Sequence, residues 1–146
     1  MANQRELDEV YMNMAHELSK LSKAERKKVG SIIVKDTQII SEGYNGTPKG
    51  FNNDCEYYDY VDEIHTKPEV LHAESNAITK LARSTNSSCG STLYVTLAPC
   101  HDCAKLIIQA GIKRVVFLEQ YRIRNSGLAL LKKAEIEVEQ LTRGKV

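Results

Sequence analysis

Three side chains with the spacing of metal ligands stand out in this sequence. His72 lies upstream of Cys100 and Cys103, which form a C-x-x-C pair. One imidazole and two thiolates are typical zinc ligands, and they are one short of the four that close a structural site. Glu74 follows His72 at two residues and is not needed to bind the metal. This set predicts a catalytic zinc with an open position for water beside Glu74.

Each residue type suits that chemistry. Zinc is a borderline soft ion, so thiolates and an imidazole bind it tightly at neutral pH. The bound ion lowers the pKa of a water molecule from about 15.7 toward neutrality. A carboxylate beside that water, here Glu74, can take its proton and later pass it to the leaving group.

The spacing also restricts where the ligands can lie. Residues two apart point to opposite sides of a helix body, so His72 and Glu74 can face one metal only from a first turn. Cys100 and Cys103 are three apart and share one side of a helical turn. We therefore predict that both motifs lie at helix N-termini, where the positive end of the helix dipole favours thiolates.

Each motif taken alone allows another interpretation. A lone C-x-x-C can be a redox pair or half of a structural zinc site, and a lone H-x-E is uninformative. Together with Pro99, the two motifs match the H-x-E…P-C-x-x-C signature of zinc deaminases. The catalytic interpretation is therefore favoured over the redox and structural ones.

Composition sets the remaining limits. The chain has 146 residues, which predicts a single domain over 1–146 that buries its own core. The net charge of +1 provides no overall field toward nucleic acid or a membrane. Four cysteines, without a secretion signal or an apolar run that spans a bilayer, predict a reducing, cytoplasmic location.

The elements that must position the site alternate between strands and helices. We expect, in order, a helix over 5–21, strands over 29–35 and 38–43, a helix over 72–83, a strand over 92–96, a helix over 100–110, a strand over 114–118, a helix over 127–134 and a strand over 136–141. This alternation predicts an α/β fold in which helices cover both faces of a mixed sheet. Ligands in such sheets bind at the carboxyl ends of strands, and both metal motifs follow segments near those ends.

The segment before the first strand has two parts. Its helix carries an apolar stripe that we expect to pack on the sheet: Leu7, Val10, Tyr11, Met14, Ala15, Leu18 and Leu21. The basic run over 23–28 follows. A solvated loop is the favoured interpretation of this run, with a phosphate contact as the alternative.

Two loops are candidates for ligand contacts. The segment 43–50 contains three glycines, an Asn-Gly pair and a proline, so its backbone can approach a ligand closely. The segment 51–69 is tyrosine-rich and acidic, and we expect a long irregular loop, which is usually functional. Cys55, His65 and Cys89 raise the possibility of a second metal site, but their irregular spacing favours inert thiols and a loop histidine.

These motifs together resemble the deoxycytidylate (dCMP) deaminases of the cytidine deaminase fold. The likeness is densest in Leu-His-Ala-Glu-Ser-Asn-Ala-Ile over 71–78 and in the stretch 93–113 around Pro-Cys-His-Asp-Cys. The loop Gly-Tyr-Asn-Gly-Thr-Pro-Lys-Gly over 43–50 also fits, and coverage extends over 26–138. The metal motif is shared by the whole superfamily. The loop and the Cys-Ala-Lys-Leu-Ile-Ile-Gln-Ala-Gly run narrow the resemblance to the deaminases that act on dCMP.

The resemblance implies a three-layer α/β/α fold with a mixed five-stranded sheet. It implies hydrolysis of dCMP to dUMP and ammonia, which supplies thymidylate synthesis. It further implies a homohexamer that dCTP activates and dTTP inhibits, each bound with Mg²⁺. Alternatives are a deaminase of tRNA adenosine or of another nucleoside or nucleotide, and a non-catalytic zinc-stabilised binding module. Near-neutral charge and the absence of tryptophan count against a polymer substrate.

The resemblance also carries roles to single residues. Glu74 would protonate N3 and then the amine, Asn45 would contact the deoxyribose, and the Ala98 carbonyl would receive the exocyclic amine. Ala73 and Tyr121 would lie beside the substrate. Candidates for the 5′-phosphate, chosen by charge and loop position, are Thr47, Lys49, Arg122 and Arg124. Candidates for the effector are Lys28, Gly43, Tyr44 and Gly46.

Overall fold

The main sheet has five strands and mixed direction. The computed structural model describes residues 1–121 and 126–142. The strands are β1 (Gly30–Lys35), β2 (Gln38–Tyr44), β5 (Thr92–Leu97), β6 (Arg114–Glu119) and β7 (Glu137–Gln140). Their order is β2-β1-β5-β6-β7; β1 is antiparallel to both neighbours, and β5, β6 and β7 are parallel. The predicted mixed five-stranded sheet is confirmed.

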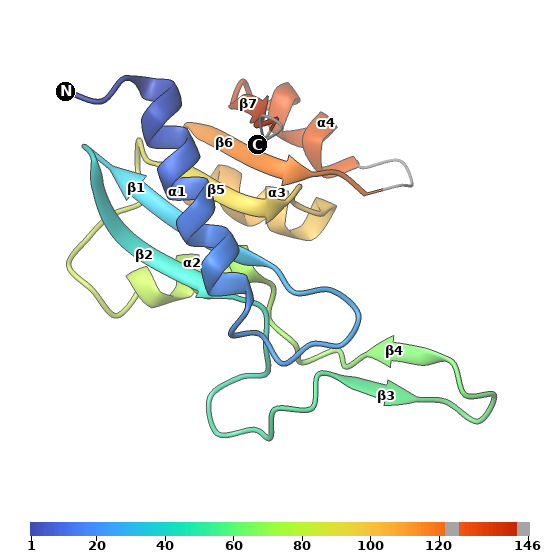
Figure 1. Cartoon of the computed structure of the whole chain (residues 1–146). Coiled ribbons are helices and arrows are strands. Elements are labelled where there is room, and N and C mark those ends of the chain that lie inside the picture. The colour runs from blue at the N-terminus through green and yellow to red at the C-terminus, as the bar shows by residue number, and fades with distance from the viewer. Residues whose placement is uncertain (122–125, 143–146) are drawn as a thin grey trace.

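Helices cover both faces of this sheet and give three layers (Figure 1). The helices are α1 (Gln4–Ser19), α2 (Ala73–Leu81), α3 (His101–Gln109) and α4 (Ser126–Lys133). Met12 and Ala15 of α1 pack with Ile32 and Tyr94 on one face. The cluster on the other face includes strand residues such as Ile33 and residues of α2, α3 and α4. Because both faces are covered, β1 is apolar and buried almost throughout rather than alternating.

The buried side of α1 differs from the predicted stripe. The helix buries Asp8, Met12, Ala15 and Ser19, whereas Val10 and Met14 are 55% and 41% exposed. The reason is an ion pair under the helix: the Asp8 carboxylate accepts two hydrogen bonds from Arg114 of β6, at 2.8 and 2.7 Å.

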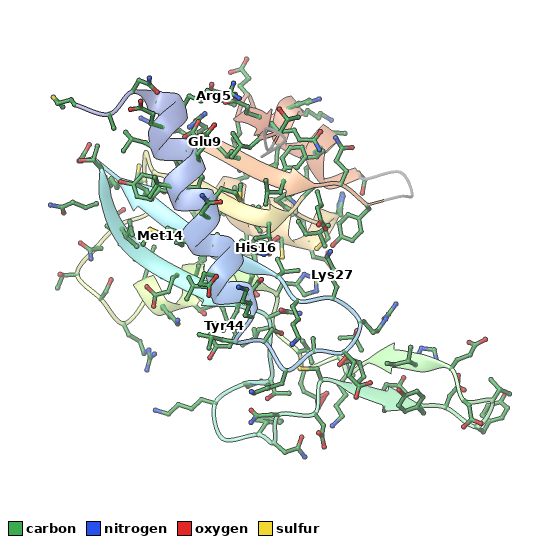
Figure 2. All side chains as sticks on the ribbon, viewed as in Figure 1. Arg5, Glu9, Met14, His16, Lys27 and Tyr44 are labelled. Carbon is green, nitrogen blue, oxygen red and sulfur yellow. The ribbon has the colours of Figure 1, made fainter. Side chains whose placement is uncertain are left out.

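The Tyr94 hydroxyl also donates to Asp8, at 2.6 Å. Burial alone would raise the pKa of Asp8, but the hydrogen bonds from Arg114, Tyr94 and Gln4 outweigh it and hold that pKa below its usual value. The opposite side of α1 carries the exposed pair Arg5 and Glu9, whose charged atoms are 3.3 Å apart (Figure 2).

A β-hairpin lies where an irregular loop was predicted. Strands β3 (Glu56–Tyr58) and β4 (Ile64–Thr66) pair antiparallel and project from the body of the molecule (Figure 1). The Asp59 carboxylate accepts the backbone N–H groups of Val61 and Glu63, which holds the turn. The irregular prediction over 51–69 is wrong for these strands, which at three residues each are too short to show an alternating pattern.

No helix in the described ranges combines the length and the apolar character needed to cross a membrane.

Candidate active site

The three predicted metal ligands converge at two helix N-termini. His72 is the residue that caps the N-terminus of α2, and Cys100 has the same position on α3. The His72 Nδ1 atom lies 3.5 Å from the Sγ of Cys100 and 3.3 Å from the Sγ of Cys103. The predicted placement of both motifs at helix starts is therefore observed.

These distances fit a tetrahedral metal. Zinc bonds of about 2.3 Å to sulfur and about 2.0–2.1 Å to nitrogen, at tetrahedral angles, separate the S and N atoms by about 3.6 Å. The observed separations of 3.5 and 3.3 Å are close to that value. His72, Cys100 and Cys103 thus form a group that can hold a metal ion.

The two thiols interact directly when no metal is bound. The hydrogen bond from Cys103, together with those from His72 and the Cys103 backbone N–H, lowers the pKa of Cys100 to about 4. The same bond to Cys100, with burial, raises the pKa of Cys103. The pair therefore shares a proton, which a bound metal would displace, because metal ligands must be deprotonated.

Glu74 is the buried carboxylate next to this group. It lies in the first turn of α2 and is only 4% exposed. Burial is the main cause that raises its pKa, to about 7. A carboxylate with a pKa near neutrality can both accept and donate a proton during one reaction cycle.

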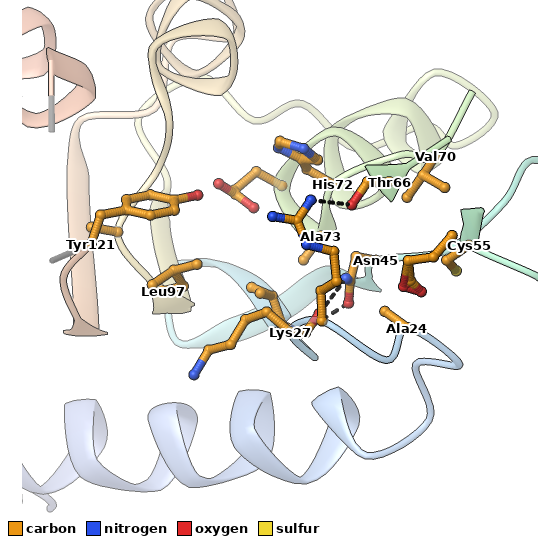
Figure 3. A pocket seen from close by; sticks show the side chains of 15 residues that line it. Ala24, Lys27, Asn45, Cys55, Thr66, Val70, His72, Ala73, Leu97 and Tyr121 are labelled. Atoms are coloured by element: carbon orange, nitrogen blue, oxygen red, sulfur yellow. Dashed lines mark hydrogen bonds between the residues drawn. The ribbon is translucent and has the colours of Figure 1, made fainter. Parts of the chain in front are cut away.

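A cavity of about 300 Å³, here called the His72 cavity, opens beside these residues (Figure 3). Its inner part includes His72 and Glu74, and the Tyr121 ring extends into it from the opposite side. Burial, followed by the negative charge of Glu74, raises the pKa of the Tyr121 hydroxyl to about 12. The other lining residues are Ala24, Arg26, Lys27, Val29, Asn45, Cys55, Glu56, Thr66, Val70, Ala73, Leu97 and Ala98.

Four predicted substrate residues line this cavity together with His72 and Glu74: Asn45, Ala73, Ala98 and Tyr121. The Asn45 side chain accepts the Val29 N–H at 2.9 Å and donates to the Lys27 carbonyl at 2.8 Å. Through these two hydrogen bonds, Asn45 holds the loop before β1, which contains Lys27 and Val29, against the cavity wall.

Other predicted residues lie elsewhere. Thr47, Lys49, Tyr44 and Gly46 line a neighbouring hollow of about 350 Å³, here called the lysine hollow. Lys28 is exposed and lines neither space. Arg122 and Arg124 are outside the described residues.

Gly43 lies under α2 rather than in either space. A Cβ atom at Gly43 would be 2.5 Å from the Ala73 carbonyl oxygen and 2.7 Å from the Ala77 nitrogen. Only glycine permits this close approach of the helix to β2. An effector contact by Gly43 stays a prediction, whereas its packing role is visible.

Sequence reasoning missed part of the cavity rim, which Arg26, Lys27, Glu56 and Thr66 form. The Arg26 Nη1 atom donates to the Thr66 Oγ1 at 3.2 Å, and Lys27 pairs with Glu119. The basic run over 23–28, with its alternative of a phosphate contact, was the available signal for Arg26 and Lys27. Nothing local in the sequence identified Glu56 and Thr66, because the hairpin brings them there.

Cys55, His65 and Cys89 are not brought together. Within the described ranges, His65 hydrogen-bonds Asp59 at 2.7 Å and stacks on Tyr57. Cys55 is buried next to the His72 cavity, and Cys89 is exposed. This arrangement agrees with the favoured interpretation of a loop histidine and two separate thiols.

Comparison with known proteins decides the family. The family described as "Cytidine and deoxycytidylate deaminase zinc-binding region" matches residues 5–119. The chain belongs to the cytidine and deoxycytidylate deaminase family. The predicted class, a hydrolytic deaminase, is confirmed at this level.

Individual members of the deaminase family are similar over most of the chain. The deoxycytidylate deaminase of Enterobacteria phage T4 is 35% identical, over 87% of this chain and 86% of that protein. The human deoxycytidylate deaminase is 41% identical, over 77% of this chain and 65% of that protein.

A solved structure of the family agrees with the described fold. The crystal structure of dCMP deaminase from the cyanophage S-TIM5 in complex with dCMP and dUMP superposes with a TM-score of 0.88. It is 43% identical and covers 96% of this chain and 100% of that chain. A structure of tRNA:A34 deaminases, at 20% identity and a TM-score of 0.60, shares the fold alone.

Proposed function

We propose that this chain is a single-domain enzyme that hydrolyses dCMP to dUMP and ammonia, with a zinc ion held by His72, Cys100 and Cys103. The observation that carries the proposal is the convergence of three ligand atoms, with both cysteine sulfurs within 3.5 Å of His72 Nδ1, beside a buried carboxylate and an open cavity. The dCMP and dUMP bound by the cyanophage relative support this substrate.

The reaction needs a nucleophile at C4 of cytosine and a proton for the leaving amine. A bound zinc ion would supply the first by lowering the pKa of water. Glu74 would take one proton from that water and deliver it to N3, and would then carry the second proton, from the hydroxyl now on C4, to the amine. The water oxygen forms the new bond to C4, the C4–N4 bond breaks, and ammonia leaves. The Ala98 carbonyl accepts a hydrogen bond from the exocyclic amine, and Tyr121 lies against the base.

Arg26 is the residue that we assign to the 5′-phosphate. It lies on the same cavity as His72 and makes no ion pair with a carboxylate of the described residues. A guanidinium suits a phosphate because its N–H donors match the phosphate oxygens. Lys27, which pairs with Glu119 on the same rim, adds a second positive charge. Thr47 and Lys49, the earlier candidates, belong to the lysine hollow.

The experiment is a comparison of dCMP, cytidine, dCTP and tRNA as substrates, with ammonia release as the readout. We expect dCMP to be strongly preferred. Glu74→Gln should retain zinc while turnover falls by about 10³-fold or more. Glu69→Gln is the matched control, since Glu69 is exposed and lines neither space. Full activity in Glu74→Gln, or turnover of tRNA in preference to dCMP, would reject the proposal. Absence of deamination by the zinc-loaded protein would favour a binding module.

Regulation by dCTP as activator and dTTP as inhibitor, each with Mg²⁺, is the second part of the proposal. The lysine hollow supports it because Lys23, Lys49 and Lys80 line it and no carboxylate of the described residues does. Asn45 and Cys55 line both spaces, so a ligand in the hollow would contact the wall of the His72 cavity. Calorimetry with dCTP and dTTP, with and without Mg²⁺, tests the proposed regulation. Lys49→Ala should weaken the binding of both nucleotides. Absence of binding to the wild-type protein would reject the proposed regulation.

We also propose a cytoplasmic homohexamer. The support is the resemblance stated above together with apolar side chains that remain exposed in the single chain, among them Val10, Met14, Tyr58, Tyr60 and Val61. All four cysteines are free, which suits a reducing compartment. Mass photometry would measure the number of subunits, and a monomer at micromolar concentration would contradict the proposal.

A further inference from the structure

The β3–β4 hairpin supplies two residues to the rim of the His72 cavity. Glu56 and Thr66 are opposite each other in the strand register, and both line the cavity. The two Glu56 carboxylate oxygens accept the backbone N–H of Glu25 at 2.9 and 3.0 Å. The Thr66 hydroxyl accepts a hydrogen bond from the Arg26 guanidinium at 3.2 Å, which is drawn as a dashed line in Figure 3. The hairpin is therefore hydrogen-bonded to the segment that carries Arg26, the residue proposed above for the 5′-phosphate.

This arrangement places a negative charge next to the proposed phosphate site. Cross-strand partners have their Cβ atoms about 5 Å apart, and the Glu56 carboxylate bonds the N–H of Glu25, the residue before Arg26. Glu56 therefore lies on the same part of the cavity rim as the Arg26–Thr66 pair. One phosphate can reach Arg26. If the first phosphate binds Arg26 as assigned above, a second phosphate on this rim would meet the like charge of Glu56, and like charges at close range cost binding free energy.

Glu56 also occupies a backbone hydrogen-bond donor beside Arg26. Backbone N–H groups are common ligands of phosphates, and the N–H of Glu25 is adjacent to Arg26 in the chain. Because that N–H already bonds the carboxylate, it is not open to an incoming anion. The repulsion by Glu56 and the occupied Glu25 N–H both weaken the binding of a second phosphate.

We propose that Glu56 is a specificity-determining residue that restricts the His72 cavity to 5′-monophosphates and rejects di- and triphosphates. The inference rests on the proposed deamination of dCMP and on the assignment of Arg26. It has a consequence for regulation: deoxycytidine triphosphate can act as an effector in the lysine hollow without being consumed as a substrate.

The test compares Glu56→Gln with the wild-type protein. Glutamine keeps an oxygen for the Glu25 N–H but removes the charge. We expect the ratio of kcat/KM for dCMP to that for dCDP to fall at least about tenfold in the variant. The ratio of the calorimetric affinities for dUMP and dUDP should fall likewise. Glu63→Gln, in the same hairpin but on neither space, should keep both wild-type ratios.

Several results would overturn the inference. Ratios in Glu56→Gln within twofold of the wild-type ratios would overturn it. An equal loss of kcat/KM and affinity for mono- and diphosphates would also overturn it, because that is the result expected if Glu56 only holds the hairpin in place. If zinc-loaded wild-type protein fails to deaminate dCMP, the proposed function fails, but the dUMP and dUDP affinities still test Glu56. If Glu56→Gln does not fold, the salt dependence of wild type decides: the preference for dUMP over dUDP must narrow as ionic strength rises.

Discussion

Replacing Gly43 with alanine should displace the helix that carries Glu74. The added Cβ atom would lie 2.5 Å from the Ala73 carbonyl oxygen and 2.7 Å from the Ala77 nitrogen, both in the backbone of α2. Backbone atoms cannot rotate away as a flexible side chain can. The helix and β2 must therefore separate, and the Ser31 hydroxyl that donates to the Ala73 carbonyl at 2.8 Å would lose its geometry.

The size of the effect follows from these distances. A carbon–oxygen contact needs about 3.2 Å or more, so the 2.5 Å approach requires a movement of about 0.7 Å. Overpacking of this kind costs about 1–3 kcal/mol of stability. Because Ala73 lies between His72 and Glu74, the same movement shifts a metal ligand and the proton carrier. A misplacement of about 1 Å can cost a catalytic site about 10²-fold, so we expect kcat/KM for dCMP to fall about 10- to 100-fold.

The assay is steady-state deamination of dCMP, with zinc content and the thermal unfolding midpoint measured on the same samples. Gly46→Ala is the matched control, because a Cβ atom at Gly46 would meet nothing within 4 Å. The control should behave like wild type. If Gly43→Ala retains wild-type kcat/KM and unfolding midpoint, the close approach of α2 to β2 does not set the site geometry, and the reasoning is refuted.

Three further predictions concern the phosphate, the metal and the buried ion pair. Arg26→Ala should raise the KM for dCMP about 10- to 100-fold. The turnover of deoxycytidine, which has no phosphate, should stay within a few fold of the wild-type value. An equal loss for both substrates would contradict the assignment of Arg26. A chelator should abolish activity and lower the unfolding midpoint, with recovery on adding Zn²⁺ but not Mg²⁺. Since the pKa of folded Asp8 lies below its usual value, its contribution to stability is present above about pH 4 and is lost as the pH falls through the folded pKa. Asp8→Asn should therefore lower the free energy of unfolding at pH 7 by about 3 kcal/mol and flatten the decline of that free energy below about pH 4, measured by urea titration. An unchanged slope would contradict this.

The metal centre was accessible from sequence because its residues are chemically distinctive and closely spaced. Cys100 and Cys103 flank one helical turn, and His72 with Glu74 needs a helix start. The strands were also predictable, because buried apolar runs such as β1 and β6 stand between turn residues. Asp36 and Thr37 make the predicted tight turn with positive φ values of 51° and 60°.

The features that were missed depend on contacts between distant residues. Asp8 is buried rather than exposed because Arg114, 106 residues away, pairs with it. The cavity rim depends on Arg26 meeting Thr66 across 40 residues and on Glu25 meeting Glu56 across 31. No local pattern encodes such pairings, so hydrophobic periodicity misjudged the buried side of α1 and treated the hairpin as irregular.

The ligands of the metal centre differ in how far apart they stand along the chain. The cysteines belong to one helical turn, but His72 is 28 residues before Cys100, on a helix that rests on another strand. In an unfolded chain the two neighbouring sulfurs are close together but the His72 imidazole is far from them, and it joins them once β2, β1 and β5 have assembled. Loading with metal must follow folding rather than direct it. In a refolding experiment, the capture of zinc would report the moment at which the sheet is complete.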